Sequence, residues 1–338
     1  HAHVNGGDRP DVGRIKTGLL GAQITADKSG YFKVQKILDG ENWRDKARSP
    51  LTQPGADVKV GDYILAVDDN SAKKVKDLYR LLTGKANQVV ELTVNSKPNE
   101  KGAKDILVKT IDDESELYYY NWVQTNIEKV NEATNGQVGY IHIPDMGPNG
   151  LNEFVKHFYP QLTKKALIID DRGNGGGNVS PMIMERLRRE LVFYSMRRNQ
   201  KSVEPSPNQI MAGPKVLLIN NYSASDGDLF PYRFKSHETG PVIGVRSWGG
   251  VVGITGSLPF IDGGQLRKPE FAPFAKDGSK FIIEGHGVDP DIVIDNDPYK
   301  EYMGEDAQLQ KAIEVVMKKL EENPVETPEI PPFPDKSK

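Results

Sequence analysis

Apolar and polar residues alternate at the two-residue period of β-strands along the first third of the chain. Short apolar runs bounded by glycine-, proline- and aspartate-containing turns predict strands at residues 18–25, 31–38, 62–67 and 87–95. An amphipathic stretch at residues 75–84, which stops at a glycine, predicts one short helix. This pattern indicates a small, mainly β domain that covers residues 16–111.

The pattern changes near Asp112, where strand-like runs begin to alternate with runs of helical period. The apolar positions predict strands at residues 137–145, 165–170, 214–223 and 241–247, and helices at residues 116–136, 151–163, 179–194, 224–237 and 305–323. Strands that alternate with helices are joined by right-handed crossovers into a mainly parallel sheet. We therefore expect an α/β domain over residues 112–322, followed by a proline-rich, extended tail at residues 323–338.

Composition narrows the class of protein. With 338 residues, 37% of them hydrophobic and 27% charged, the chain predicts a packed globular protein. The net charge of -3 argues against a nucleic-acid-binding protein, which would present a basic face. The absence of cysteine excludes disulfides, zinc–thiolate sites and thiol catalysis. No apolar stretch approaches the about 18 residues of a membrane span. Because the chain opens at His1 without a methionine, we expect a fragment or a processed piece of something longer.

The stretch "LLINNYSASDGDLFPYRFK", residues 217–235, raises the main chemical question. Ser225 and Asp228 have the spacing of a capping box, so the serine could serve only to start a helix. A serine at a strand-to-helix turn also projects from the carboxyl end of a parallel sheet, where such sheets place their sites. The next amide, that of Asp226, could stabilise an oxyanion there. The G-x-S-x-G elbow is absent, since Ser223 stands where its first glycine would be.

A nucleophilic serine needs a base and a group that orients the base. No lysine lies between Ser236 and Arg267, which favours a histidine. Glu284 ends an apolar run, an expensive place for an unpaired carboxylate, so it is either an orienting acid or a solvated charge at a strand end. Spacing does not choose among the six histidines, which are His1, His3, His142, His157, His237 and His286.

A second motif, "IIDDRGNGGGNVS", places four glycines between a strand and a helix. Such a loop can bring backbone N–H groups close to an anion. The nucleotide-binding versions are disfavoured, because the third glycine of G-x-G-x-x-G and the G-K-[ST] of a P-loop are missing. An oxyanion-binding loop and a plain tight turn both stay open.

These motifs together resemble the catalytic part of tricorn proteases, within the tail-specific (C-terminal-processing) serine peptidases. The resemblance lies in "NNYSASDGDLFPYRFK", "GPVIGVRSWGGVVGI", "DDRGNGGGNVS" and "EGHGVDPDIVI". "HAHVNGGD" is similar to the segment that supplies the family's histidine, and "GLLGA" at residues 18–22 to the carboxylate-binding loop of a PDZ domain. The resemblance covers about residues 1 to 320 and implies an α/β (α+β) two-domain protein. A histidine-bearing segment at residues 1–15 and a small PDZ-like β domain would precede a ClpP/crotonase-like catalytic domain with parallel strands and crossover helices.

The resemblance also implies roles for individual residues. Ser225 would be the nucleophile, because the family's serine directly precedes Asp-Gly. His1 would be the base, with His3 as the alternative, and Glu284 would orient it. The backbone amides of Asp226 and of Gly175 or Gly176 would form the oxyanion hole. Leu19, Leu20 and Gly21 would bind the C-terminus of a peptide.

The resemblance predicts a serine endopeptidase that acts on unfolded proteins or oligopeptides. It implies neither metal nor organic cofactor, a homo-oligomer by analogy with family rings, and a cytoplasmic location with a periplasmic one as the alternative. Two other classes stay open. One is a catalytically silent peptide-binding scaffold. The other is a crotonase-like acyl-CoA enzyme, for which the glycine loop offers no basic residue beyond Arg172.

Overall fold

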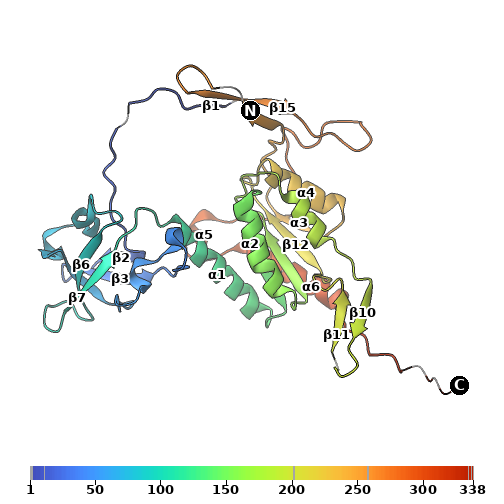
Figure 1. The fold of residues 1–338 in the computed structure, drawn as a ribbon, viewed down its shortest axis with the longest axis horizontal. Coiled ribbons are helices and arrows are strands. Elements are labelled where there is room, and N and C mark those ends of the chain that lie inside the picture. Colours follow the sequence, from blue (N-terminus) through green and yellow to red (C-terminus); the bar gives the residue numbers. More distant parts are fainter. Residues whose placement is uncertain are drawn as a thin grey trace. The chain divides into compact units, whose positions relative to one another are not determined.

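The computed structural model describes residues 3–10, 12–200, 202–256 and 259–333, together with Asp335 and Ser337. The chain divides into two compact units (Figure 1). The smaller unit is Pro10–Thr125, and the larger one combines His1–Arg9 with Asn126–Lys338. The smaller unit is therefore an insertion between a short N-terminal segment and the rest of the larger unit.

The smaller unit is built on an antiparallel sheet, as the two-residue period predicts. Its strands are β2 (Ala22–Ala26), β3 (Phe32–Ile37), β4 (Tyr63–Val67), β6 (Val89–Asn95) and β7 (Lys104–Lys109), in that spatial order, with β5 (Asn70–Ser71) paired to β4. Leu20, Val34, Ile64 and Leu92 are fully buried at its core. The apolar members of the alternating pattern thus form one hydrophobic layer.

Short 3-10 helices connect these strands: η1 (Asp45–Ala47), η2 (Pro50–Thr52), η3 (Ala72–Lys74) and η4 (Leu78–Leu82). The helix predicted at residues 75–84 is η4, a 3-10 helix rather than an α-helix. The side chain of Asp77 accepts the N–H of Tyr79 at its start. Leu78 and Leu82 are its buried residues, so two side chains anchor this short helix in the core.

The larger unit is built on a five-stranded parallel sheet, as predicted. The strand order is β16 (Ile292–Val293), β13 (Val242–Gly244), β12 (Lys215–Ile219), β9 (Ala166–Asp170) and β8 (Val138–His142). All five residues of β8, β9 and β12 are buried, because helices cover both faces of the sheet. This arrangement confirms the predicted mixed α/β class.

The two helical layers follow from the alternation of side chains along the strands. One face packs against α2 (Pro148–Phe158), α3 (Ser180–Leu187) and α4 (Asp226–Ser236), through buried residues such as Phe154, Ile183 and Phe230. The other face packs against α6 (Ala307–Glu322) and the end of α1 (Ser115–Ala133). The remaining short helices are η5 (Tyr159–Gln161) and α5 (Pro298–Tyr302).

A three-stranded antiparallel sheet in the order β1-β15-β14 completes the larger unit (Figure 1). Strand β1 (His3–Asn5) pairs with β15 (Gln265–Phe271), and β14 (Gly253–Gly256) pairs with β15 on its other side. His3 lies opposite Arg267. The N-terminal segment therefore lies with the larger unit, although the smaller unit separates the two in sequence.

Two predicted elements differ from the observed ones. The helix predicted at residues 179–194 ends at Leu187, and Phe193–Met196 instead forms strand β10, which pairs with β11 (Val203–Ser206). Pairing in this hairpin satisfies the backbone groups that a longer helix would have bonded. The apolar run before Glu284 forms no strand; Phe281 makes a single bridge with Phe274, and Ile283 has a φ of 45°.

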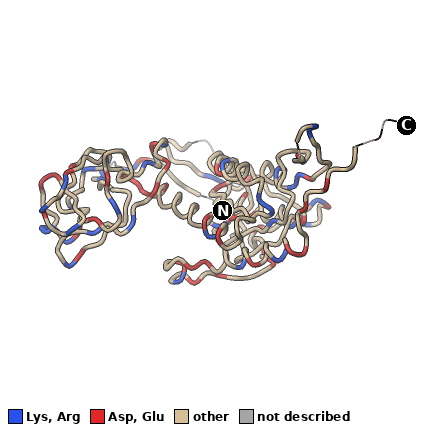
Figure 2. Tube along the Cα trace, turned by 90° about the horizontal axis from the view of Figure 1, so that it is seen from below, with Lys and Arg blue, Asp and Glu red and all other residues tan. Residues whose placement is uncertain are grey.

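Charged residues of both signs are interspersed along each unit, in line with the small net charge (Figure 2). Within the described part of the chain, no helix is both long and apolar enough to cross a membrane.

Candidate functional site

Ser225 lies where β12 has ended and α4 begins, in an unusual backbone conformation. Its φ is 58° and its ψ is -119°. Few residues with a side chain adopt a positive φ, so the surrounding contacts must hold this turn in place. The side chain of Ser225 is half-buried at this sharp turn.

The neighbouring Ser223 has a structural role. It is fully buried, its hydroxyl donates to the carbonyl oxygen of Asp171 at 2.8 Å, and the same hydroxyl accepts the N–H of Asn220 at 3.2 Å. A hydroxyl that satisfies two backbone groups stabilises the turn and is not available to a substrate. Of the two serines, Ser225 is the one at the surface of the site.

The glycine loop packs directly on the Ser225 turn. A Cβ at Gly176 would lie 2.6 Å from the Cβ of Ser225 and 3.0 Å from the amide nitrogen of Asp226. A Cβ at Gly227 would lie 2.4 Å from the carbonyl oxygen of Asn174. These approaches require glycine, so two of the glycines that the sequence singled out serve the contact between the loop and the helix start.

Two N–H groups at this contact have no partner within the described residues. They belong to Asp226, in the first turn of α4, and to Gly175. The N–H of Gly176, by contrast, donates to the side-chain oxygen of Asn174 at 2.9 Å. Of the two glycine amides predicted as oxyanion donors, Gly175 is therefore the one whose N–H has no partner among the described residues.

Asn174 organises the loop, and the sequence did not single it out. Its side chain is fully buried and donates to the carbonyl oxygen of Ile143 at 3.0 Å. Its own carbonyl oxygen accepts the N–H of Ala224 at 2.8 Å. Asn174 thus connects the glycine loop, the residue that follows β8 and the turn that carries Ser225.

Asp228 is a second residue that the motif analysis used only as part of a helix cap. Its carboxylate accepts the N–H of Ser225 at 2.8 Å, as the capping box predicts. It also accepts the N–H groups of Gly249 at 2.7 Å and Gly250 at 3.1 Å. Burial raises the pKa of Asp228, and these bonds oppose the rise. Asp228 therefore ties the Ser225 turn to the loop that follows Trp248.

Glu284 supports the next part of the same loop. Its Oε2 atom accepts the N–H of Val251 at 2.7 Å and that of Val252 at 2.9 Å. It lies in a turn and not at the end of a strand. Whether it also orients a histidine stays a prediction.

The histidine predicted as the base, His1, lies outside the described residues. The alternative, His3, is exposed on β1, which pairs with β15 of the larger unit. His142 is buried against the carbonyl oxygen of Arg172 at 3.0 Å, and burial lowers its pKa. His286 is paired with Asp289 at 2.8 Å.

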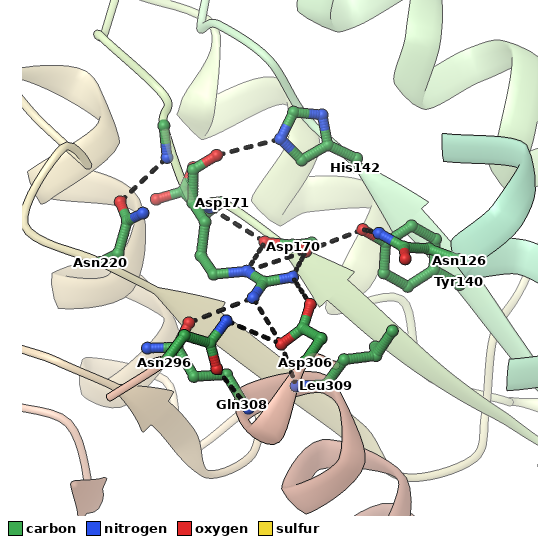
Figure 3. A network of polar contacts seen from close by, with 12 residues as sticks. Asn126, Tyr140, His142, Asp170, Asp171, Asn220, Asn296, Asp306, Gln308 and Leu309 are labelled. Carbon is green, nitrogen blue, oxygen red and sulfur yellow. Dashed lines mark hydrogen bonds and ion pairs between the residues drawn. The ribbon is translucent and has the colours of Figure 1, made fainter. Parts of the chain in front are cut away.

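A buried ionic network lies directly before the glycine loop (Figure 3). Arg172 makes two hydrogen bonds of 2.9 Å with Asp306 at the start of α6, and it also binds Asp170. Tyr140 donates to the same Asp170 at 2.7 Å and receives a bond from Asn126. This network fixes the end of β9 to α6 and α1. From the sequence alone, Arg172 could be singled out only as a possible contact to a phosphate group.

Asp171, between Asp170 and Arg172, is buried with its side chain fully removed from solvent. Burial, followed by the charges of Asp170, Asp226 and Asp228, raises its pKa far above the usual value for a carboxyl group. Burial and the neighbouring carboxylates therefore both disfavour the charged form of Asp171.

The predicted peptide-binding loop of the smaller unit already has partners within the chain. The N–H of Leu19 donates to the carbonyl oxygen of Ile111 at 2.8 Å, and that of Gly21 to the carboxylate of Glu114 at 2.7 Å. Leu20 is fully buried in the core. Capture of a peptide C-terminus at Leu19, Leu20 and Gly21 stays a prediction, and it requires these bonds to be exchanged.

No group of three or more potential metal-ligating side chains was found among the residues that the structure describes.

Comparison with known proteins matches both units. Residues 18–113 match the family model of the tricorn protease PDZ domain, and residues 137–294 match that of peptidase family S41. Tricorn protease of Thermoplasma volcanium is 37% identical over 328 residues, which are 97% of this chain and 31% of that protein. Tricorn protease homolog 1 of Streptomyces coelicolor is 35% identical over 314 residues, which are 93% of this chain and 29% of that protein.

Comparison of the structure with solved structures gives the same family. The crystal structure of the tricorn protease matches with a TM-score of 0.87 and 34% identity, over 95% of this chain and 31% of that one. This chain thus spans about a third of the length of the relatives it matches. The chain belongs to the tricorn protease family, with a tricorn PDZ domain followed by a peptidase family S41 domain.

Proposed function

We propose that the larger unit is the catalytic domain of a serine peptidase, with Ser225 as its nucleophile. The observation that carries this proposal is the backbone of Ser225, at φ 58° and ψ -119°, with Gly176 packed against its Cβ. Ser225 also takes part in the capping box of α4, but a helix cap needs only an ordinary extended conformation. Ser225 instead has a positive φ, beside two N–H groups that have no partner among the described residues.

The reaction that fits this geometry is acyl transfer to Ser225. The hydroxyl oxygen attacks a peptide carbonyl carbon while its proton passes to a histidine. The N–H groups of Asp226 and Gly175 stabilise the negative oxygen of the tetrahedral intermediate. Collapse of the intermediate breaks the C–N bond, and the histidine returns its proton to the amine. Water then cleaves the acyl-enzyme by the same steps.

The base in this proposal is His1, with His3 as the alternative, and Glu284 is the group that orients it. Support comes from β1, because the pairing of His3 with Arg267 brings the N-terminal segment to the larger unit. Support for Glu284 comes from its bonds to Val251 and Val252, in the loop that Asp228 ties to Ser225. Unfolded proteins or oligopeptides are the proposed substrates, and self-association and a cytoplasmic location stay predictions.

The direct test is labelling with a fluorophosphonate probe, which reacts only with an activated serine. We expect the chain to be labelled and the Ser225→Ala variant to show background signal only. Ser236→Ala is the matched control, since Ser236 is an exposed residue at the end of the same helix whose hydroxyl bonds the carbonyl oxygen of Tyr232. It should be labelled as fast as the unchanged chain.

The base is identified by the same measurement in His1→Ala and His3→Ala. The variant that lowers the labelling rate removes the base. Since this chain spans about a third of its relatives, a chain extended upstream of His1 is assayed alongside. Labelling of Ser225→Ala at the rate of the unchanged chain, or no labelling of either the chain or its extended form, would refute the proposal.

A further inference from the structure

A pocket lies where strand β12 of the parallel sheet begins, away from Ser225, which follows the end of that strand. Its volume is about 370 Å³. It surrounds Lys215, the first residue of β12, whereas Ser225 follows the last residue of that strand. The other lining residues follow α3, precede β12 or follow α4; they include Arg188, Arg189, Glu190, His237 and Thr239. The proposed catalytic roles involve none of these residues.

Lys215 places a cation at the base of this pocket. Its side chain is 8% exposed, and its ammonium group donates to the carbonyl oxygen of Gly213 at 3.1 Å. No carboxylate of a described residue lies within 4.0 Å of it. Burial lowers the pKa of Lys215 to about 8. At pH 7 the group therefore still carries most of its charge, at a cost that an anion would relieve.

Two arginines add charge near the mouth of the pocket. Arg188 is exposed and Arg189 half-buried, and neither forms an ion pair with a described carboxylate. Among the described residues that line the pocket, Glu190 is the only acidic one. Three cations and one carboxylate leave a formal charge of +2, which a divalent anion would neutralise.

Thr239 supplies an independent observation. Its hydroxyl oxygen is buried and has no hydrogen-bond partner among the described residues. A buried hydroxyl without a partner is rare, because it forfeits the bonds that it makes in water. A bound acceptor in this pocket would provide that bond.

The charge preference of helix ends explains only some of the positively charged residues around this pocket. Arg188 and His237 are the residues that end α3 and α4, and positive charge is favourable at helix C-termini. This effect explains a cation on the surface. It does not explain why Lys215 is buried without a carboxylate, nor why the hydroxyl of Thr239 is left unbonded.

We propose that this pocket binds a divalent tetrahedral oxyanion of the phosphate class, at a site separate from Ser225. Lys215 and Thr239 contact the anion at the base of the pocket, and Arg188 and Arg189 contact it from the rim. A tetrahedral dianion suits these groups better than a carboxylate, because it offers acceptors to donors that converge from three segments of the chain.

The test is titration calorimetry and thermal unfolding of the chain with inorganic phosphate, glycerol 3-phosphate and acetate, at constant ionic strength. We expect inorganic phosphate to bind and to raise the midpoint of unfolding, and acetate to do neither. Binding of glycerol 3-phosphate as well would identify a phosphate monoester, and not only the free ion, as a ligand. Equal effects of acetate and phosphate would overturn the proposal.

Three variants locate the site. Lys215→Met keeps the apolar stem and should weaken phosphate binding by about 10- to 100-fold. Arg188→Gln changes a surface residue, so it should fold normally, and it should also weaken phosphate binding. It tests the site if Lys215→Met does not fold. Lys109→Met, at an exposed position of β7 in the smaller unit, is the control and should bind as the unchanged chain does.

Binding that is equally strong in Lys215→Met and Arg188→Gln would show that phosphate binds elsewhere. Ser225→Ala should bind phosphate normally, so the outcome of this test is independent of the peptidase proposal.

Discussion

At the scale of single residues, the conformation of Ser225 is maintained by one neighbour in the same turn and by one that is distant in sequence. A side chain at a strained φ costs about 1–3 kcal/mol, which the surrounding structure must offset. Asp228 holds the N–H of Ser225, and Asn174 holds that of Ala224. These two bonds fix the turn that carries Ser225, and the proposed catalysis by oriented N–H groups requires such preorganisation.

Gly176→Ala tests this preorganisation. The added methyl would meet Ser225 and Asp226 at 3.0 Å or less, at a φ of 101° that favours glycine, so the loop must move away from the serine. A displacement of about 1 Å in such a site can lower the rate by about 100-fold, and we expect a loss of fluorophosphonate labelling rate of that order. Gly13→Ala is the control, because a Cβ there meets nothing within 4 Å. Unchanged labelling of Gly176→Ala would mean that the loop does not position the serine.

The sequence identified residues whose role depends on local pattern. Ser225 and Asp228 could be found because a cap has a fixed spacing, and the glycine loop because it follows an apolar strand. Asn174 and the bonds from Asp228 to Gly249 and Gly250 could not, because they join segments that only the folded sheet brings together. The sequence also could not show that the N–H of Gly176 donates to the side-chain oxygen of Asn174.

At the scale of elements, the contact between Arg172 and Asp306 joins β9 to α6. Burial acts to raise the pKa of Asp306, but the charge and bonds of Arg172 outweigh it and leave that pKa lowered. Stability from this carboxylate is therefore present above its unfolded-state pKa and is lost as the pH falls through the folded-state pKa.

Asp306→Asn should lower the free energy of unfolding by about 3 kcal/mol at pH 7, because it breaks a buried pair and leaves Arg172 partly uncompensated. Urea unfolding followed by circular dichroism measures it. Asp297→Asn is the matched control, since Asp297 caps the exposed helix α5 and asparagine caps equally well. If the two variants lose the same stability, the network does not hold α6 to the sheet.

A second contact at this scale concerns the PDZ domain. Glu114, just before α1, holds the N–H of Gly21, the group that a peptide carboxylate would need. We expect free peptides with ordinary C-termini to bind weakly to the chain, and Glu114→Ala to bind them more tightly. Fluorescence anisotropy of a labelled peptide measures this. Glu116→Ala is the control, since Glu116 belongs to the same segment but lies 3.9 Å from Arg44 and does not bond Gly21. Tighter binding in both variants, or in neither, would contradict a blocking role for Glu114.

Elements with a strong period were predictable, and those set by distant pairing were not. The parallel strands β8, β9 and β12 are continuous apolar runs, so their place in the buried sheet followed from the sequence. The helix predicted at residues 179–194 failed beyond Leu187, because its apolar residues there serve the β10–β11 hairpin. A helical period cannot reveal a strand partner that lies ten residues further along.

At the scale of the whole molecule, the chain is one folded unit inserted into another. Sequence similarity covers both units, and the described structure shows the N-terminal strand β1 with the second of them. This arrangement could be expected only from the resemblance of "HAHVNGGD" to a histidine-bearing segment. No periodicity in three residues predicts a partner more than 260 positions away.

The insertion bears on how strongly β1 is held near β15. On its C-terminal side, β1 is connected to the rest of the larger unit through residues 10–125. If those residues were unfolded, they would form a flexible tether with a typical span of about 60 Å. When they are folded, fewer residues of this tether are flexible, and the effective concentration of β1 at β15 rises. If the proposed base on this segment acts on Ser225, melting of the PDZ domain would lower its effective concentration at the serine, and a mutation far from Ser225 would then lower the catalytic rate.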